Sequence, residues 1–130
     1  MDKLEIFTLI LNTCADVCYV SVEDVMNGAK KESVVTARAL CIFWTDAAGF
    51  SVESLTQLTK SSHAASINSI KSKQEDFWCH RFAYHMLVIE VGKRLLDAAH
   101  EIGEDFDMWV PIRRIAKSTG KYNNAIPKTN

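Results

Sequence analysis

Apolar residues recur in this chain at intervals of three and four positions, and this spacing constrains the fold more than any other feature. Two segments, 2–18 and 77–102, show it most clearly. Their repeating apolar positions are Leu4, Phe7, Leu11, Cys14 and Cys18 in the first segment, and Tyr84, Val88, Val91, Leu95, Ala98 and Ile102 in the second. Such spacing gathers side chains on one face of an α-helix. Because no segment alternates apolar and polar residues over the length of a strand, the sequence predicts an all-α fold.

A short helix is predicted between these two segments, over residues 22–27. Ser21 precedes Glu23 and Asp24, a pattern in which a hydroxyl caps the first N–H groups and carboxylates lie at the positive helix end. Gly28 follows and suits the left-handed conformation in which many helices end.

A basic pair, Lys30 and Lys31, separates this short helix from a longer one. Ser33 is the expected N-cap of the longer helix, and Gly49 is its expected end. Its inward positions are Val34, Ala37, Cys41, Trp44 and Ala48. A loop with two lysines followed by a long apolar helix is therefore expected here.

Two further helices follow, joined by the polar turn at residues 60–62. Ser51 is the expected cap of the first, and Ser62 is the expected cap of the second. The second helix is expected to turn Ala65, Ile67 and Ile70 inward, and its predicted outer face carries His63, Ser66, Asn68 and Lys71. Two helices joined by a short polar turn are typical of a helix-turn-helix unit.

The helix order of residues 20–70, the basic loop and His63 resemble the C-terminal DNA-binding domain of the bacterial replication initiator DnaA. In that family a basic loop enters the minor groove and the recognition helix reads the major groove. The resemblance implies a Trp-repressor-like helix-turn-helix bundle that binds double-stranded DNA. The residues that it assigns to DNA are Lys30, Lys31, Ser33, Arg38, Lys60, Ser62, His63, Ser66, Asn68 and Lys71.

This chain departs from the family at positions that contact DNA. Glu32 stands where the family has a groove-inserting arginine, and Ala64 and Ala65 stand where it has paired threonines. A glutamate at a phosphate-rich groove adds repulsion, whereas alanine methyl groups can still touch a thymine methyl. We therefore expect altered or weakened DNA specificity. The alternative is a protein-interaction or regulatory module that kept the scaffold and lost its DNA contacts.

Charge is unevenly distributed along the chain, although the net charge is only −1. Residues 1–17 sum to −2, 18–75 to 0, 76–110 to −4 and 111–130 to +5. A neutral helix-turn-helix region argues against strong DNA binding, because phosphate neutralisation supplies much of the affinity. The basic residues Arg113, Arg114, Lys117, Lys121 and Lys128 can offset the acidic segment or track phosphates.

The expected organisation is a helix-turn-helix region at 1–75, a C-terminal helical extension at 76–120 and a flexible tail at 121–130. The polar residues 74–76 mark the joint, a long helix over 77–102 follows, and Pro111 suits the start of a short last helix. Gly92 lies within the long helix, where a close helix crossing is one explanation for it. The apolar run 77–91 is a possible surface for a homo-oligomer or a protein partner.

No enzymatic, cofactor or membrane motif emerges from the sequence. Phosphate-loop, nucleophile-elbow and zinc-protease motifs are missing, so a non-enzymatic protein without a cofactor is expected. The four cysteines, Cys14, Cys18, Cys41 and Cys79, lie in apolar helical segments. Core thiols are the default interpretation, and a zinc site is the alternative, although its spacing is weak. With no long apolar span or basic signal segment, a cytoplasmic bacterial protein is expected.

Overall fold

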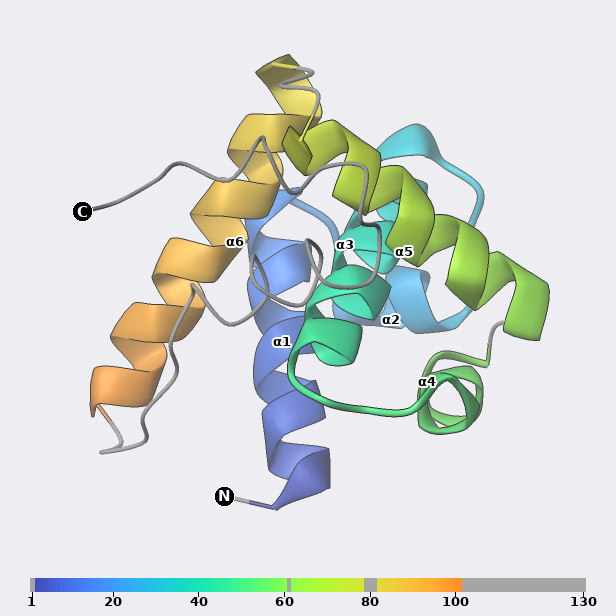
Figure 1. Cartoon of the computed structure of the whole chain (residues 1–130), viewed down its shortest axis with the longest axis horizontal. Coiled ribbons are helices and arrows are strands. Elements are labelled where there is room, and N and C mark those ends of the chain that lie inside the picture. Colours follow the sequence, from blue (N-terminus) through green and yellow to red (C-terminus); the bar gives the residue numbers. More distant parts are fainter. Residues whose placement is uncertain (1, 61, 79–81, 102–130) are drawn as a thin grey trace.

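A computed structural model describes residues 2–60, 62–78 and 82–101, with side chains placed for all of these except His63, 72–78 and 82–85. Every regular element in these ranges is an α-helix, which confirms the predicted all-α class. The helices are α1 (Lys3–Val17), α2 (Val22–Met26), α3 (Glu32–Ala47), α4 (Val52–Thr59), α5 (His63–Trp78) and α6 (Phe82–Glu101), as shown in Figure 1.

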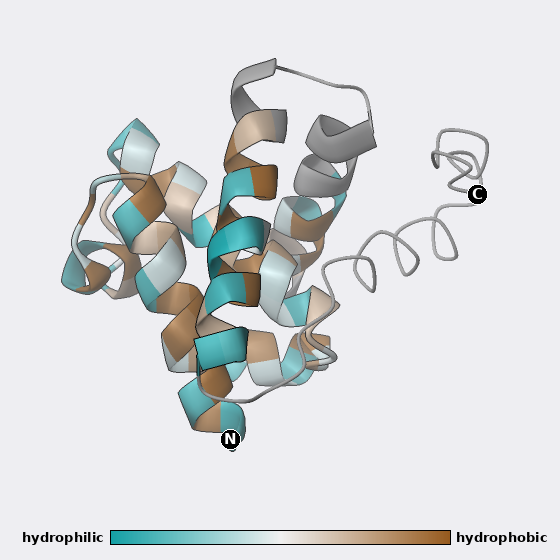
Figure 2. Cartoon of the chain, turned by 90° about the vertical axis from the view of Figure 1, so that its left-hand side faces the viewer, coloured by the Kyte–Doolittle hydropathy of each residue, from teal (hydrophilic) through white to brown (hydrophobic). Residues whose placement is uncertain are grey.

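Helix α3 lies at the centre of the fold and packs against α1, α2, α4 and α5. Its buried residues are Val34, Ala37, Leu40, Cys41, Ile42, Phe43, Trp44, Thr45 and Ala47. Apolar side chains of α1, α4 and α6 join them in one core, among them Phe7, Leu55 and Val91. Figure 2 shows hydrophobic residues on the sides of the helices that face one another and hydrophilic residues outside. A helix enclosed on so many sides needs apolar residues around most of its circumference.

Helix α6 returns alongside α1 in the opposite direction and also packs against α5 (Figure 1). Among its described residues, the buried hydrophobic ones are Val88, Val91, Leu95 and Ala99. Gly92 faces the indole of Trp44, and a Cβ atom there would lie 2.8 Å from Cη2 and 3.0 Å from Cζ2 of that ring. The sequence offered a close helix crossing as one explanation for Gly92, but the neighbour that a Cβ would meet is a core tryptophan side chain.

Serine caps begin three of the helices, as predicted. The hydroxyl oxygens of Ser21, Ser51 and Ser62 accept hydrogen bonds of 3.1 Å from the backbone N–H groups of Asp24, Ser54 and Ala65, respectively. Each bond satisfies one of the N–H groups that a first helical turn leaves unpaired.

Glycines follow α2 and α3 in the left-handed conformation, with φ of 77° at Gly28 and 100° at Gly49. Both positions agree with the predicted helix ends, although α2 ends at Met26, one residue before the predicted boundary. Glycine takes positive φ without the steric cost that a Cβ imposes.

Two predicted boundaries are wrong. Helix α3 begins at Glu32, and its N-cap is Lys31, without a side-chain cap bond, so Ser33 is not the cap. Helix α5 runs through residues 74–76 without a break, so the helix predicted over 77–102 is divided between the end of α5 and α6. Gln74, Glu75 and Asp76 are polar, but none of them stops a helix as proline does, and a polar helical stretch needs only a side facing solvent. The predicted last helix and tail lie outside the described residues.

Candidate nucleic-acid interface

Helix α4 ends at Thr59 and α5 begins at His63, and Lys60 and Ser62 are the described residues between them. Lys60 adopts the left-handed conformation, with φ of 56°, and reverses the chain directly after α4. Ser62 then caps α5 through its hydroxyl, and its carbonyl oxygen accepts a hydrogen bond of 3.0 Å from the N–H of Ser66. In Figure 1, α4 is seen nearly end-on and α5 from the side, so their axes cross steeply. The predicted pair of helices joined by a short turn is therefore present, and we refer to it as the α4–turn–α5 unit.

Buried side chains of α4 hold this unit against the core. Leu55 is fully buried. The hydroxyl of Thr59, which is also buried, donates a hydrogen bond of 2.6 Å to the carbonyl oxygen of Leu55. Ile70 of α5 also packs against the core. The core therefore fixes both helices, and the remaining faces are available to a partner.

The exposed face of α5 carries Ala64, Ala65, Asn68 and Lys71. Positions 64, 68 and 71 are separated by four and three residues, so these side chains form one stripe along the helix. Asn68 and Lys71 are therefore exposed, as the sequence predicted for DNA contacts. Ala65 was predicted to face inward and is exposed instead. His63 begins α5, but its side chain lies outside the described ones, so its predicted role stays a prediction.

Ser66 was predicted on this outer face, and this placement is wrong. Its side chain is fully buried, and its hydroxyl has no hydrogen-bond partner. Ser66 lies four residues before Ile70, so both belong to the stripe that faces the core. Its small size allows α5 to lie close to its neighbours, but in this position it cannot contact DNA.

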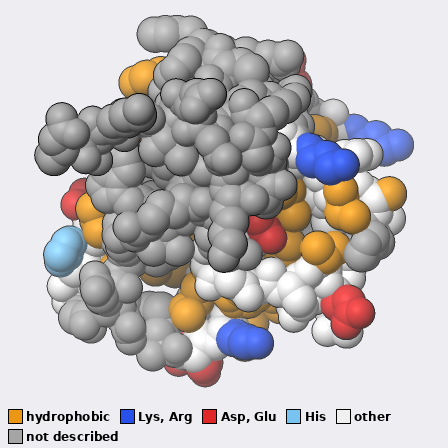
Figure 3. Space-filling view, in the orientation of Figure 1, with side chains coloured by type: hydrophobic (Ala, Val, Ile, Leu, Met, Phe, Trp, Pro, Cys, Tyr) orange, Lys and Arg blue, Asp and Glu red, His pale blue; other side chains and the backbone are white. Residues whose placement is uncertain are grey.

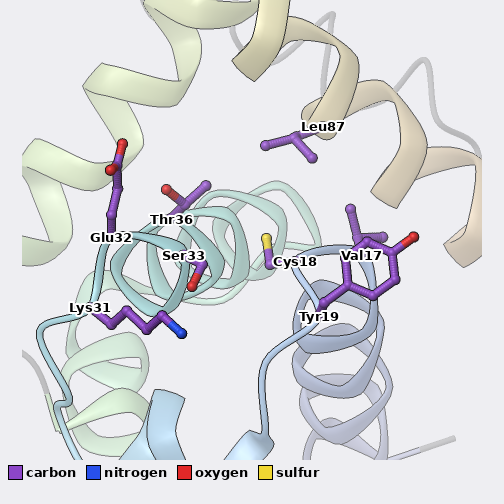
Figure 4. Close-up of a pocket in the computed structure, with 8 residues that line it drawn as sticks. All are labelled: Val17, Cys18, Tyr19, Lys31, Glu32, Ser33, Thr36 and Leu87. Atoms are coloured by element: carbon purple, nitrogen blue, oxygen red, sulfur yellow. The ribbon is translucent and has the colours of Figure 1, made fainter.

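The loop before α3 presents the basic pair. Lys30, Lys31 and Glu32 are all exposed, whereas Ser33 is half-buried. Figure 4 shows the side chains of Lys31 and Glu32 pointing in different directions from the start of α3. The lysines therefore remain accessible to an anion, and Glu32 places one negative charge beside them.

Arg38, one of the predicted DNA contacts, holds the end of α2 instead of extending into solvent. Its Nε donates to the carbonyl oxygen of Val25 at 2.9 Å, and a terminal nitrogen lies 3.1 Å from that of Ala29 and 3.5 Å from that of Asp24. The carbonyls at a helix C-terminus lack intrahelical partners, and a guanidinium satisfies several at once. Arg38 thereby positions the loop that carries Lys30 and Lys31.

An open hollow of about 750 Å³ lies beside this loop. It is lined by Val17, Cys18, Tyr19, Lys31, Glu32, Ser33, Thr36 and Leu87, which come from α1, α3, α6 and adjoining loops (Figure 4). Tyr19 is 93% exposed and has a positive φ of 56°. Tyr19 follows the end of α1 in the left-handed conformation, a position where glycine is usual. The spacing of apolar residues could not have predicted a tyrosine with this backbone conformation.

The described cysteines Cys14, Cys18 and Cys41 are thiols, not disulfides. Burial raises the pKa of the Cys14 thiol well above its ordinary value, and a hydrogen bond with Cys41 raises it further. No group of three possible metal ligands is found in the described part of the chain. Likewise, none of the described helices combines the length and hydropathy needed to cross a membrane.

The structure thus gathers Lys60, Ser62, Asn68 and Lys71 along the turn and α5, and Lys30 and Lys31 in the loop before α3. Figure 3 shows Lys and Arg side chains at the upper right, in the region that α5 and this loop occupy in Figure 1. Arg38 and Ser66 do not belong to this set, because Arg38 bonds the end of α2 and Ser66 is buried.

Comparisons of the chain with protein-family models, curated proteins and solved structures gave no match in any of the three.

Proposed function

We propose that this chain is a helix-turn-helix protein that binds double-stranded DNA through α5 and the Lys30-Lys31 loop. The observation that carries the proposal is the α4–turn–α5 unit, whose second helix exposes the stripe Ala64, Asn68 and Lys71. The sequence from Ser62 to Lys71 contains no carboxylate, so nothing in this stretch repels phosphate. A helix of this kind fits the major groove of B-DNA.

The basic loop supplies phosphate contacts beside this helix. Lys30 and Lys31 are exposed, and Arg38 fixes the end of α2 from which they project. Glu32 opposes insertion of the loop start into a narrow, strongly negative groove. The resemblance to the DnaA C-terminal domain therefore supports docking of α5 in the major groove, with the loop contacting phosphates instead of entering the minor groove and with a target different from that family's box.

A second candidate function is a protein-interaction module, and the surroundings of Glu32 favour it. Glu32 and the nearly fully exposed Tyr19 border the same open hollow, which also includes Leu87. An exposed aromatic ring beside apolar and charged groups is typical of protein interfaces. DNA binding and this alternative make opposite predictions for the experiment below.

The test is fluorescence anisotropy with a labelled random duplex at low and physiological salt. The site variant is the double substitution Lys30→Ala and Lys31→Ala. Its matched control is Lys3→Ala and Lys93→Ala, which removes two exposed lysines from α1 and α6. Arg38 is left unchanged because its loss would release the end of α2.

We expect the wild-type protein to bind, and its affinity to fall steeply as salt rises. The plot of log affinity against log salt has a negative slope, and the loss of two phosphate contacts should make this slope less steep by about 2 in the site variant. The control variant keeps the wild-type slope. If the wild-type protein shows no salt-sensitive affinity even at low salt, DNA binding is wrong and the interaction module takes its place.

A further inference from the structure

We propose that α5 reads A·T base pairs, with Asn68 pairing with an adenine and the methyl groups of Ala64 and Ala65 contacting thymine. This inference rests on the proposed function and specifies its target. It follows from which side chains of α5 the structure exposes and which it buries. Because Ser66 is buried and Arg38 is hydrogen-bonded to the end of α2, neither side chain is available to contact a base.

Asn68 is the exposed side chain on this face that can identify a base by two hydrogen bonds. Its carboxamide carries a donor and an acceptor in one plane, which matches N7 and the N6 amino group of adenine in the major groove. Ser66, another predicted DNA contact of this stretch, is fully buried. Lys71 offers donors alone and lies farther along the helix, where a phosphate contact suits it.

Guanine finds no arginine among the described side chains of this face. Guanine is usually read by an arginine or a lysine that donates to O6 and N7 together, and the lysine of this face, Lys71, lies at the opposite end of the stripe from Ala64. The guanidinium of Arg38 donates hydrogen bonds to the carbonyl oxygens of Val25, Asp24 and Ala29. Arg94 lies on α6, where its Nε is 3.1 Å from a carboxylate oxygen of Glu90. At the end of the stripe that carries Ala64 and Asn68, the described side chains therefore favour A·T over G·C pairs.

Ala64 and Ala65 add an apolar contact at the start of the helix. Both are exposed, and the small methyl group lets the helix axis lie close to the base edges. The thymine C5-methyl is the apolar feature of the major groove. Residues 64 and 68 are about 6 Å apart along the helix axis, close to two base-pair steps of about 3.4 Å each. We therefore expect two A·T pairs about two steps apart in the preferred site.

The test is selection from a random duplex library, followed by affinity measurements on the enriched duplex and on a scrambled one. The proteins are the wild type, Asn68→Ala, and the matched control Asn12→Ala, which makes the same change at an exposed position of α1. A third variant, Lys71→Ala, removes the expected phosphate contact. Circular dichroism establishes that each variant is folded before it is compared.

We expect the wild-type protein to enrich A·T pairs about two steps apart. Asn68→Ala should lose about 5- to 150-fold in affinity for the enriched duplex, the range for one two-bond base contact, and change little on the scrambled duplex. Lys71→Ala should weaken both duplexes equally, and Asn12→Ala should leave both unchanged.

Two results overturn the inference and are distinguishable from each other. If the wild-type protein and Asn68→Ala enrich the same pairs with equal affinity, Asn68 reads no base, while DNA binding itself stands. If no protein binds either duplex even at low salt, the proposed function fails and the base reading fails with it.

Discussion

At the scale of single residues, Ser66 places an unpaired hydroxyl in a fully buried position on α5. A buried polar group without a partner costs free energy because it has given up its hydrogen bonds to water. In a simple amphipathic helix the polar residues face solvent and the apolar residues face the core. The start of α5 shows the opposite arrangement, with Ser66 buried and Ala64 and Ala65 exposed. A serine at this position is therefore expected to weaken the fold slightly.

Replacing Ser66 with alanine should raise the free energy of unfolding by about 1 kcal/mol, since the penalty of the unpaired hydroxyl disappears. Urea denaturation followed by circular dichroism measures the change. The control is Ser69→Ala on the same helix, which is half-buried and reports the helix propensity of alanine alone. A decrease in stability for Ser66→Ala would show that the hydroxyl has a stabilising partner.

Lys60 combines a positive charge at the turn with a left-handed backbone, and two substitutions separate these properties. Lys60→Gly and Lys60→Ala both remove the charge, so both should weaken DNA binding equally. Only glycine relieves the cost of a φ of 56° at this position, so Lys60→Gly should be more stable than Lys60→Ala by about 1 kcal/mol. Equal stability of the two variants in urea denaturation would mean that the turn takes another conformation.

The buried Cys14 thiol gives the fold a dependence on alkaline pH. Its pKa is raised in the folded state by burial and by the Cys41 hydrogen bond, whereas an unfolded cysteine ionises near pH 8.5. Its contribution to stability is therefore complete below about pH 8.5 and is lost as the pH rises toward the folded-state pKa.

We expect the free energy of unfolding of the wild type to fall more steeply between pH 8 and 10 than that of Cys14→Ala. The difference between the two slopes approaches about 1.4 kcal/mol per pH unit where the unfolded thiol is ionised and the folded thiol is not. Denaturation at a series of pH values measures both slopes, and identical slopes would contradict the assignment.

At the scale of elements, Gly92 of α6 contacts the Trp44 indole of α3. An added Cβ would meet ring carbons at 2.8 Å and 3.0 Å, closer than a carbon can lie without displacement. Trp44 is 2% exposed, so its ring has little room to move. The absence of a side chain at position 92 is therefore a packing requirement.

Gly92→Ala should lower the free energy of unfolding by about 1–3 kcal/mol because it overpacks this contact. In a Trp44→Leu background the same substitution should be neutral or stabilising, since the ring is gone and alanine favours the helix by about 1 kcal/mol. A double-mutant cycle measured by denaturation gives the coupling. Stabilisation by Gly92→Ala in both backgrounds would rule out the steric contact.

The beginnings and ends of the elements were largely predictable because they depend on nearby residues. Ser21, Ser51 and Ser62 cap helices within three positions of themselves, and Gly28 and Gly49 end helices by their own backbone freedom. The roles of Arg38 and Ser66 depend on how their helices pack against other elements. For Ser66 a signal existed, since Ile70 four residues later marks the inward stripe. For Arg38 none did, because its partners lie 9 to 14 positions away.

At the scale of the whole molecule, the described helices share one core around α3. Phe7 of α1, Leu55 of α4 and Leu95 of α6 belong to the same buried cluster. Helix α6 therefore supports the α4–turn–α5 unit from within a common core. A single core holds the elements that carry the exposed face of α5 and the Lys30-Lys31 loop in a fixed arrangement, which the proposed recognition of a duplex requires.

The most direct test of this account is a titration of isotope-labelled protein with a short random duplex at low salt, followed by amide NMR shifts. The account predicts shifts concentrated at Lys30, Lys31 and residues 60–71, with little change in α1 and in the second half of α6. Absence of shifts at every duplex concentration, or shifts confined to α1 and α6, would contradict DNA binding through the helix-turn-helix.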